Sequence, residues 1–388
     1  MNILHISPYL PALEENHAGG VCMGKEIETL KKHHSVYILS FVISQKDKEL
    51  ATKYYNEYHY LHRWTTVQRL LSILTHPWLP HFFAARSSHK FKKNIKNVII
   101  KYNINAVHAE YASMGQYLLY IKKHFPHIKC ILVEHDFTEQ SYQRKISNSA
   151  NIIRRLYYRI QLKQIHYYEK KYCTIADNIL TFNNKDKNLI ESAYAINTVH
   201  VINPYYGIED IDHHSYQKKT KQLCFVGQMS RNENSIAALR LARIYNQIAD
   251  VVPELKLTII GNNPSAKLKS LENDMIRVTG YVEDIDEEIR GCLLGVFPLT
   301  EGAGIKLKVL RCLALGIPVI TTRVGAEGID EDGKILKIVE TDEEFKNVII
   351  TSISDLGELM NWSQRGIRYV QEHFSWYKTE EILNKVYK

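Results

Sequence analysis

The sequence predicts an α/β protein with two Rossmann-like, doubly wound domains, and three observations support this fold class. Short apolar segments alternate with helix-like segments along the chain, and such alternation is typical of parallel sheets covered by helices. The alternation stops at one turn-rich, charged segment, Asn203–Lys221, and then starts again. The length of 388 residues suits two to three domains of roughly 150 residues each.

The first domain is expected over residues 1–203, with a linker at 204–221. A loop that ends in Gly19 and Gly20 follows the first strand, and the helical spacing of apolar residues begins at Val21. Apolar runs predict six strands, namely Asn2–Ser7, Val36–Ile43, Asn105–Glu110, Lys129–Glu134, Asn178–Phe182 and Thr198–Ile202.

The second domain is expected over residues 222–370, and a C-terminal helix at 371–388 is expected to pack back on the first domain. Its first two strands each end in a glycine, which is typical of a turn close to a ligand. The expected strands are Leu223–Val226, Leu255–Gly261, Arg277–Val282, Leu293–Pro298 and Pro318–Thr322.

Composition places the chain among globular proteins and favours a reducing compartment. The apolar fraction is 45% and the charged fraction 24%. The six cysteines are scattered without a Cys-x-x-Cys pair, which argues against a zinc site or a disulfide framework. The N-terminus lacks the features of a signal peptide, and the charge-free stretch Leu70–Ala85 is too short and too rich in proline to span a bilayer. We therefore expect a cytoplasmic protein.

Positive charge is concentrated in one part of the chain. Residues 61–175 contain 19 Lys/Arg against 5 Asp/Glu, a net charge of +14, whereas the whole chain carries +8. Aromatic and aliphatic residues alternate with these basic residues, a composition that suits an anionic membrane surface or acceptor. A solvated basic face on ordinary helices is the plainer alternative. Nucleic acid is a third, but no nucleic-acid-binding motif supports it.

The loop 300–305 lies between a predicted strand and a predicted apolar helix. Gly302 and Gly304 allow the backbone to approach a ligand closely. Free amides and the helix dipole favour an anion at a helix N-terminus, and Lys306 and Lys308 add positive charge. This spacing favours a diphosphate site. The alternative is a tight turn with surface lysines.

The segment from Gly302 to Ile329 reads GAGIKLKVLRCLALGIPVITTRVGAEGI. It resembles the donor-binding signature of retaining glycosyltransferases of family 4, in particular the subgroup with a GxGxKLKVLEA motif. Further similarities lie in AGGVCMGKEIETL, VEHD, YYEKKYCTIADNILTFNNKDKNLI, VINPYYGIED, LCFVGQMSRNENSIAAL, LTIIGNNP, RVTGYVEDIDEEI and FSWYKTEEILNKVYK. The similarity covers most of the chain and is specific for the superfamily, not for the sugar.

The resemblance implies the GT-B fold, in which two Rossmann-like domains face a cleft. It also implies transfer of a sugar from a nucleotide-diphosphate sugar with retention, without a cofactor or metal, and with UDP as the favoured nucleotide. Catalytic roles are implied for His135, Glu301 and Lys306. Donor-binding roles are implied for Gly19, Gly20, Gly227, Arg231, Gly302, Ala303, Gly304, Ile305, Lys308 and Arg311.

The sequence also departs from this family at the donor motif. Many relatives carry Glu-x7-Glu, but the two positions are Ala303 and Arg311 here, and Glu301 could replace the first glutamate only with a shifted loop. An arginine and a lysine common on the diphosphate are replaced by Gln228 and Glu233. A carboxylate accepts hydrogen bonds from ribose hydroxyls, whereas an arginine only donates. Arg311 therefore contacts the ribose in another geometry, contacts a phosphate, or marks a lost donor site.

Three other polar positions have open interpretations. His135 is expected on the acceptor side or at the sugar, or it only hydrogen-bonds a loop backbone. Asp284 and Asp286 more readily cap a helix than hold a metal. Glu169 helps to shape the cleft or pairs with a basic neighbour.

Three function classes follow from the sequence. The first is a glycosyltransferase that builds a bacterial surface polysaccharide on a lipid-linked or glycan acceptor, peripherally bound at the inner face of the cell membrane through the basic, aromatic residues 61–175. The second is a catalytically degenerate GT-B partner or scaffold subunit, which the replaced donor residues favour. The third is a different GT-B enzyme, a phosphorylase or an epimerase, but the loop lysines are in the wrong context for a pyridoxal lysine.

Overall fold

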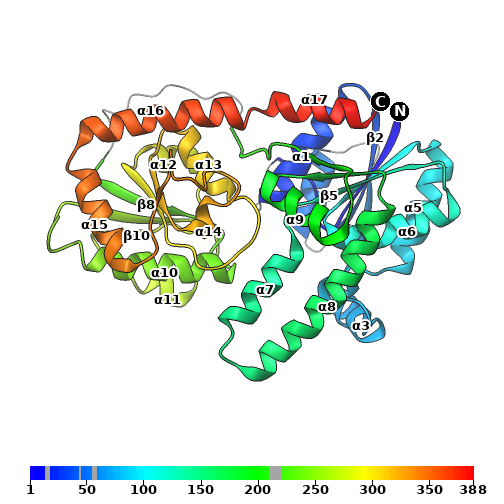
Figure 1. The fold of residues 1–388 in the computed structure, drawn as a ribbon, viewed down its shortest axis with the longest axis horizontal. Coiled ribbons are helices and arrows are strands. Elements are labelled where there is room, and N and C mark those ends of the chain that lie inside the picture. Colours follow the sequence, from blue (N-terminus) through cyan, green and yellow to red (C-terminus); the bar gives the residue numbers. More distant parts are fainter. Residues whose placement is uncertain (14–17, 43–44, 55–58, 209–219) are drawn as a thin grey trace. The chain divides into compact units, whose positions relative to one another are not determined.

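The computed structural model describes residues 1–13, 18–42, 45–54, 59–208 and 220–388 (Figure 1). The chain divides into two compact units. The N-terminal unit comprises Met1–Tyr205 and Trp376–Lys388, and the C-terminal unit comprises Tyr206–Ser375. The division falls inside the predicted linker 204–221, most of which lies outside the described residues.

The N-terminal unit contains a seven-stranded parallel sheet with the order β3-β2-β1-β4-β5-β6-β7. Its strands are β1 (Asn2–Ser7), β2 (Ser35–Val42), β3 (His59–Arg63), β4 (Ala106–Glu110), β5 (Lys129–Glu134), β6 (Asn178–Thr181) and β7 (Val199–Val201). Six of them match predicted strands within one residue or two. The edge strand β3 was not predicted, because its sequence HYLHR has no apolar run.

Helices cover both faces of this sheet (Figure 1). They are α1 (Ala18–Lys31), α2 (Gln45–Tyr54), α3 (Thr66–Thr75), α4 (His81–Ala84), α5 (His89–Tyr102), α6 (Gly115–His124), α7 (Thr138–Asn148), α8 (Ile152–Ile175), α9 (Asn184–Tyr194) and α17 (Trp376–Val386), with a short 3-10 turn at Ala112–Met114. The predicted loop at Gly19 and Gly20 is wrong in one respect, because both glycines lie in the first turn of α1.

The C-terminal unit contains a six-stranded parallel sheet with the order β10-β9-β8-β11-β12-β13. Its strands are β8 (Gln222–Val226), β9 (Lys256–Ile260), β10 (Ile276–Val278), β11 (Leu294–Phe297), β12 (Val319–Thr321) and β13 (Lys337–Ile338). The prediction of a strand to Val282 is wrong. The strand stops at Val278, because the chain turns at Gly280, where φ is +69°.

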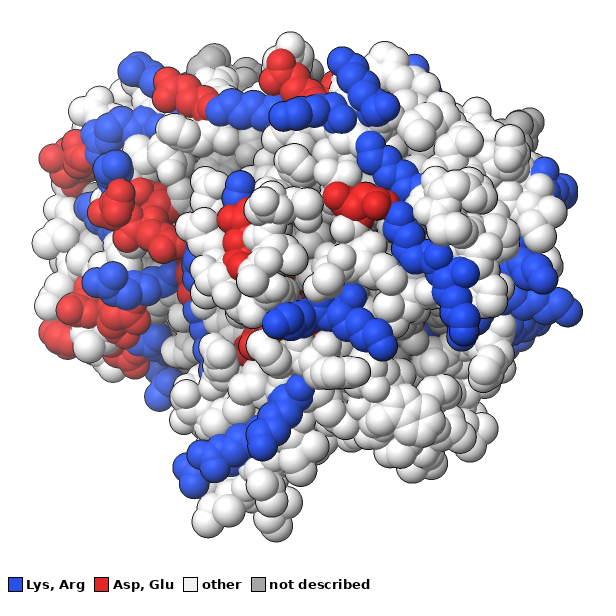
Figure 2. Space-filling model, turned by 45° about the vertical axis from the view of Figure 1, so that its right-hand side comes forward, with Lys and Arg blue, Asp and Glu red and all other residues white. Residues whose placement is uncertain are grey.

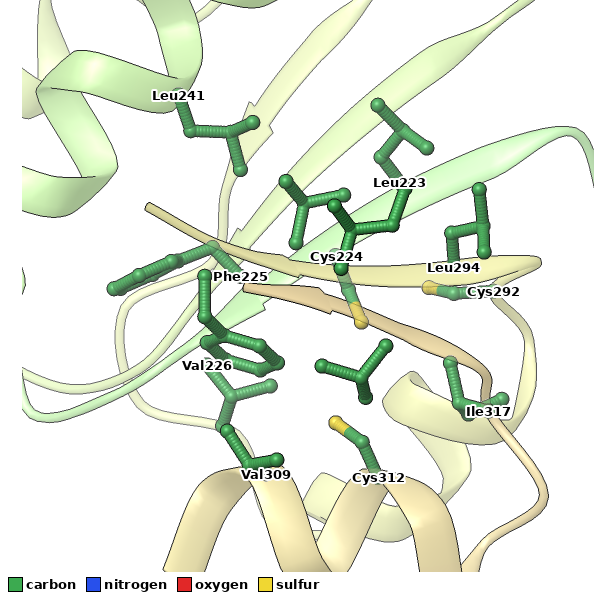
Figure 3. Packing of buried hydrophobic residues seen from close by; sticks show 14 of the residues in the cluster. Leu223, Cys224, Phe225, Val226, Leu241, Cys292, Leu294, Val309, Cys312 and Ile317 are labelled. Carbon is green, nitrogen blue, oxygen red and sulfur yellow. The ribbon is translucent and has the colours of Figure 1, made fainter. Parts of the chain in front are cut away.

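The helices of this unit are α10 (Asn232–Asn246), α11 (Ala266–Lys269), α12 (Ile285–Arg290), α13 (Leu307–Ala314), α14 (Arg323–Ala326), α15 (Asp342–Ile353) and α16 (Leu356–His373). Figure 3 shows Leu241 of α10 on one side of the sheet, and Val309 and Cys312 of α13 on the other. This packing explains why β8 reads as a continuous apolar run, since both faces are buried. The α/β, doubly wound fold class is therefore confirmed for both units.

Helix α17 returns the end of the chain to the N-terminal unit. The Trp376 indole donates to the Thr29 hydroxyl at 2.9 Å, and the Thr379 hydroxyl donates to the Asn203 carbonyl at 2.8 Å. The Tyr387 hydroxyl lies 2.5 Å from Nδ1 of the buried His108. Among the residues that the structure describes, no helix is both long and apolar enough to cross a bilayer.

Both sheets have a point at which the strand order reverses, between β1 and β4 and between β8 and β11. In open parallel sheets, ligands bind beyond the carboxyl ends of the strands at such a switch point. The residues that follow β1 and β4 in one unit, and β8 and β11 in the other, are therefore the first places to look for a site.

Candidate functional site

The loop after β11 has the backbone of an anion site. Gly302 and Gly304 have φ angles of 112° and 66°, a region that favours glycine. Helix α13 then begins at Leu307, and its N-cap residue Lys306 makes no side-chain hydrogen bond to the first helical amides. The Val309 amide donates to the Lys306 carbonyl at 2.8 Å, whereas the amides of Leu307 and Lys308 remain available to a ligand at the positive end of the helix dipole.

The side chain of Lys306 fixes the direction of the loop's peptide groups. Its Nζ donates to the Gly304 carbonyl at 2.6 Å and to the Ala303 carbonyl at 3.3 Å, and lies 3.9 Å from Oε2 of Glu327. In a trans peptide the N–H points away from the C=O. The amides of Gly304 and Ile305 therefore point away from the ammonium group, as successive amides do in anion-binding loops.

The turn after β8 is coupled to α13 through Asn234. A Cβ atom at Gly227 would lie 2.9 Å from the Asn234 side-chain amide, so the position needs glycine. Asn234 donates from Nδ2 to the Gln228 carbonyl at 2.9 Å, and its Oδ1 accepts a hydrogen bond from Nζ of Lys308. One buried amide thus fixes the positions of both loops.

Lys308 is the most perturbed cation of this group. Its Nζ lies 5.0 Å from the centre of the Phe225 ring and 5.9 Å from that of Phe297. Burial, together with the charges of Lys306 and Arg231, lowers the pKa of Lys308 to about 7. A bound anion would favour the charged form of the lysine and raise this pKa.

Arg231 contributes less to the site than the sequence suggests. It is the N-cap residue of α10, without a side-chain capping bond. Its Nη2 forms an ion pair with Oε1 of Glu233 at 2.6 Å, and 62% of its side chain is exposed. An exposed pair of this kind contributes little to stability, so the arginine can move toward a ligand.

Arg311 is held by a carboxylate. Its Nε donates to Oδ1 of Asp286 at 2.6 Å. Its guanidinium lies against Gly207, where φ is +92° and an added Cβ atom would approach Nη1 to 2.6 Å. The capping interpretation of Asp284 is confirmed, because its Oδ1 accepts from the amides of Asp286 and Glu287 at 2.8 and 3.1 Å. Asp286 itself is the partner of Arg311.

In the N-terminal unit, His135 follows β5 and lies among aromatic residues. Its Nε2 is 2.7 Å from Oε2 of Glu110. Its ring stacks on Tyr111, with centroids 3.7 Å apart, and meets the edge of Phe182. The alternative that His135 only bonds a loop backbone is wrong. Tyr111 has a φ of +68°, and such strain in a non-glycine residue is common at functional sites.

Glu110 is the centre of a buried network that joins β1, β4 and α1. Its Oε1 lies 2.9 Å from Nε2 of His5 and 3.1 Å from Nε2 of His108, and the latter atom is 3.2 Å from Oε2 of Glu26. Burial opposes charge on His108, but its hydrogen bonds to Glu110 and Glu26 raise its pKa to about 9. Burial also opposes charge on Glu110, yet hydrogen bonds from His108, His135 and His5 hold its pKa well below the usual value. At neutral pH the centre is therefore a carboxylate paired with an imidazolium.

The same residues form a group that could ligate a metal. The ligand atoms of His5, His108 and Glu110 all lie within 4.8 Å of one another. However, the two imidazoles lie at N–H···O hydrogen-bond distances from one carboxylate oxygen, and the hydrogen bonds to Glu110 and Glu26 raise the pKa of His108 to about 9. A metal would require an unprotonated nitrogen on each ring. The observed contacts describe a proton-bearing network.

Glu169 lies in a second buried group on α8. It accepts from the Tyr194 hydroxyl at 3.1 Å and from the Thr138 amide at 3.4 Å. Burial, together with the nearby charge of Glu139, raises the pKa of Glu169 to about 8. The alternative of a basic neighbour is wrong, because no Lys, Arg or His of the described chain forms an ion pair with Glu169.

The C-terminal unit also matches a known protein family. Residues 220–355 match the family described as "Glycosyl transferases group 1". The matched residues lie within the C-terminal unit, Tyr206–Ser375.

Solved structures share the fold over the whole chain at low sequence identity. Sucrose-phosphate synthase of Thermosynechococcus elongatus matches with a TM-score of 0.71 and 14% identity, covering 100% of this chain and 98% of that one. HepE of Anabaena in complex with UDP matches with a TM-score of 0.67 and 12% identity over 100% and 99% of the chains. TarM of S. aureus matches with a TM-score of 0.72 and 8% identity over 100% and 98%. The predicted GT-B fold is confirmed.

A curated relative comes from Klebsiella pneumoniae. It is an uncharacterized 44.6 kDa protein in the cps region, 24% identical over 277 residues, which covers 67% of this chain and 68% of the relative.

The structure places most of the expected donor residues in the C-terminal unit. Lys308 bonds Asn234, which packs against Gly227, and the charges of Lys306 and Arg231 act on Lys308. Gly19, Gly20 and His135 belong to the other unit. Glu301 lies half-buried in the loop and forms no ion pair with another residue of the described chain.

Sequence reasoning missed three residues of these sites, namely Glu110, Tyr111 and Asp286. Glu110 and Tyr111 end the apolar run AVHAEY. Polar residues at the end of a buried strand could therefore have indicated that these two belong to a site. No local signal could identify Asp286 as the partner of Arg311, which is 25 residues away.

Proposed function

We propose that the chain is a glycosyltransferase that transfers a sugar from a nucleoside diphosphate sugar to an acceptor with retention. The observation that carries this proposal is the loop 302–306. The amides of this loop that point away from the Lys306 ammonium group, together with Lys306 and Lys308 of α13, follow β11 at the switch point of the C-terminal sheet, within the residues that match glycosyl transferases group 1. A diphosphate is the ligand that such a loop suits, because it presents several anionic oxygens to amides and cations.

In this reaction the nucleoside diphosphate leaves the sugar and gains negative charge. Preorganised amides and cations at the diphosphate stabilise that charge in the transition state. We assign this role to the amides of Gly304 and Ile305, with Lys306 shaping the loop and Lys308 supplying charge. Because the protein supplies these groups itself, we propose that the reaction needs no metal.

UDP is the first nucleotide to test. Solved structures of HepE contain UDP or UDP-glucose, and one of TarM contains UDP with α-GlcNAc-glycerol. At this level of identity they establish only the fold, so the choice of UDP is part of the proposal.

On the acceptor side, we assign His135 to the sugar or the acceptor, with Glu110 and Tyr111 fixing its ring. We assign Glu301 to the sugar. The relative in a cps region supports a role in the synthesis of a bacterial surface polysaccharide. We propose a lipid-linked or glycan acceptor at the inner face of the cell membrane, with the basic residues 61–175 facing an anionic surface.

The decisive experiment is a thermal-shift assay with UDP, GDP, CDP and their sugars. A ligand that binds only the native state stabilises it by about 2.7 kcal/mol at a hundredfold excess over Kd. We expect a shift with one base that is lost in Lys306→Ala and kept in Lys334→Ala, whose side chain is 73% exposed in the same unit. The absence of any shift with well-folded protein would contradict the proposal.

The Arg311–Asp286 ion pair favours a second candidate, a GT-B subunit that has lost its donor site. The pair occupies the position at which relatives carry a ribose-binding glutamate. In the first candidate the pair instead presents the Asp286 carboxylate to the ribose, since Arg311 binds it through only one nitrogen in this structure. The two candidates differ in one result: Asp286→Asn weakens nucleotide binding only if the donor site works.

A further inference from the structure

Helix α3 has its apolar stripe on the outside. Val67, Leu70, Leu71 and Leu74 recur at helical spacing and are 55% to 74% exposed. Trp78, just after the helix, is also exposed. The only fully buried residue of the helix is the polar Ser72. An amphipathic helix normally buries its apolar stripe, so this orientation requires a partner outside the protein.

The first half of α8 also has its apolar side chains exposed instead of buried. Ile152, Ile153, Leu156 and Ile160 lie on adjoining turns and are 52% to 80% exposed. Only from Gln161 onward does the helix bury side chains in the unit. We call the exposed apolar residues of α3 and of the start of α8 the two-helix surface.

Both helices are fixed to the same connecting segment, so the two-helix surface is a rigid feature of the N-terminal unit. Ser72 of α3 donates to the Ala84 carbonyl at 2.7 Å. Gln164 of α8 donates to the Pro77 carbonyl at 2.9 Å, and Gln161 accepts from the His81 amide at 2.8 Å. In Figure 1, α3 lies near the middle of α8.

The charge around this surface has one sign. Residues 61–109 and residues 140–168 contain no Asp or Glu. Arg154, Arg155 and Arg159 are exposed on the same turns of α8 as the apolar residues. In Figure 2, the right-hand and lower parts of the view, which belong to the N-terminal unit, carry stripes of Lys and Arg beside uncharged surface.

We propose that the two-helix surface docks on an anionic lipid bilayer, with its apolar side chains inserted at the level of the headgroups. Exposed apolar stripes flanked by arginines match both parts of such a bilayer, because the stripes reach the acyl boundary while the arginines meet the phosphates. Trp78 suits the interface, where one end of the indole is apolar and the other wet.

A second copy of the chain fits this surface less well. A symmetric contact would bring the same arginines of both copies together without a carboxylate to pair them, and like charges facing each other oppose association. Nucleic acid would use the arginines but leave the apolar stripes exposed. The bilayer uses both.

This inference rests on the proposed function in one respect: docking on a bilayer would give the proposed glycosyltransferase access to a membrane-held acceptor. Vesicle binding and nucleotide binding are measured separately. A protein that binds vesicles without binding nucleotide would contradict the proposed sugar transfer alone. The reverse result would contradict this inference and the proposed membrane location, but not the sugar transfer.

The test is co-sedimentation with vesicles of phosphatidylglycerol and phosphatidylcholine. We expect binding that Leu70→Gln/Leu74→Gln or Ile153→Gln/Leu156→Gln weakens at least about tenfold, given the transfer free energy of a buried leucine or isoleucine. The control variant Val251→Gln/Leu356→Gln changes two exposed apolar residues of the C-terminal unit and should bind like the unchanged protein. All six substituted residues are exposed, so each variant should fold.

Charge is tested in the same assay. Arg154→Gln/Arg155→Gln should weaken binding to the anionic vesicles about tenfold, since each arginine contributes on the order of 1 kcal/mol near such a surface. The matched change Lys334→Gln/Arg365→Gln, at exposed cations of the C-terminal unit, should have no effect. Vesicles of phosphatidylcholine alone should bind more weakly.

Insertion is read from Trp78, because Trp64 and Trp362 are buried and Trp376 is half-buried with its indole hydrogen-bonded to Thr29 of the N-terminal unit. Lipids brominated in their acyl chains should quench the protein fluorescence, and Trp78→Phe should abolish this quenching. Absence of vesicle binding, or equal binding by the apolar variants, would overturn the proposal. So would a dimer in solution that Leu70→Gln/Leu74→Gln converts to a monomer, since the occupant would then be a second copy.

Discussion

At the scale of single residues, Lys308 links nucleotide binding to pH. Its pKa of about 7 in the free protein leaves it largely neutral at pH 8, and a bound diphosphate would raise this pKa. Binding of UDP at pH 8 should therefore take up nearly one proton. The affinity should fall by up to about tenfold per pH unit above pH 7, until the pH reaches the pKa of the complex.

Isothermal titration calorimetry in buffers with different ionisation enthalpies measures this uptake. Lys308→Met should abolish it and weaken binding. Lys267→Met, at an exposed lysine of α11, should leave both unchanged. Proton uptake that persists in Lys308→Met would assign the linkage to another group.

Substitution of glutamine for each of two buried glutamates of the N-terminal unit should lower stability by very different amounts. Glu110 is ionised and hydrogen-bonded to His108, so Glu110→Gln leaves the buried imidazolium with Glu26 as its remaining carboxylate neighbour. Loss of a buried charged partner should cost about 3–5 kcal/mol. Glu169 has a pKa of about 8 and is already mostly protonated at pH 7. Glu169→Gln replaces one neutral group by another of similar shape and should cost less than about 1.5 kcal/mol.

Urea denaturation at pH 7, followed by circular dichroism, compares the two variants directly. Equal losses would contradict the assigned ionisation states, because both carboxyl groups are buried to the same extent. Equal losses would mean that Glu110 is not the ionised centre of its hydrogen-bond network.

At the scale of elements, the glycine loop before α13 should separate binding from stability. Gly302→Ala or Gly304→Ala forces an L-residue into positive φ, which costs roughly 1–2 kcal/mol, and reorients the amides that would meet a diphosphate. We expect weaker UDP binding in addition to lower stability. Gly333→Ala is the control, because Gly333 has a similar φ of +70° in the same unit but lies outside the site. It should lose stability without losing affinity, and an equal loss of affinity in all three variants would exclude a specific role for the loop.

The elements that the sequence predicted well are the buried strands, since a parallel strand covered on both faces is a continuous apolar run. The short edge strands β3 and β13 lack such a run and were missed. The loop 300–305 could be located from its sequence, because two glycines and two nearby lysines directly before an apolar helix are typical of an anion-binding turn. The contacts of Lys306, Arg311 and His135 could not be predicted, because each depends on how a loop or a distant strand is placed after folding.

At the scale of the whole molecule, the two units differ in whether their buried groups take up or release protons on folding. Hydrogen bonds stabilise the protonated form of His108 in the N-terminal unit, where burial also keeps Glu169 protonated. Burial favours the neutral form of Lys308 in the C-terminal unit. The folded N-terminal unit therefore binds more protons than its unfolded form near pH 8, and the folded C-terminal unit binds fewer.

This difference predicts opposite responses to alkaline pH. Stability from His108 is complete below its usual pKa of 6.5 and is lost as the pH rises through about 9, and stability from Glu169 is lost as the pH rises through about 8. The N-terminal unit should therefore lose stability between pH 7 and pH 9. Lys308 has a folded pKa of about 7 against its usual 10.5, so over the same range the C-terminal unit should gain stability.

Hydrogen exchange of peptides from β4 and β8, corrected for the intrinsic exchange rate at each pH, reports the two units separately. Protection of β4 should fall from pH 7 to pH 9, while protection of β8 should hold or rise. His108→Gln should reduce the change at β4 alone, and Lys308→Met the change at β8 alone. A parallel loss of protection in both strands would mean that the two units unfold as one, and that neither buried group determines how its unit responds to pH.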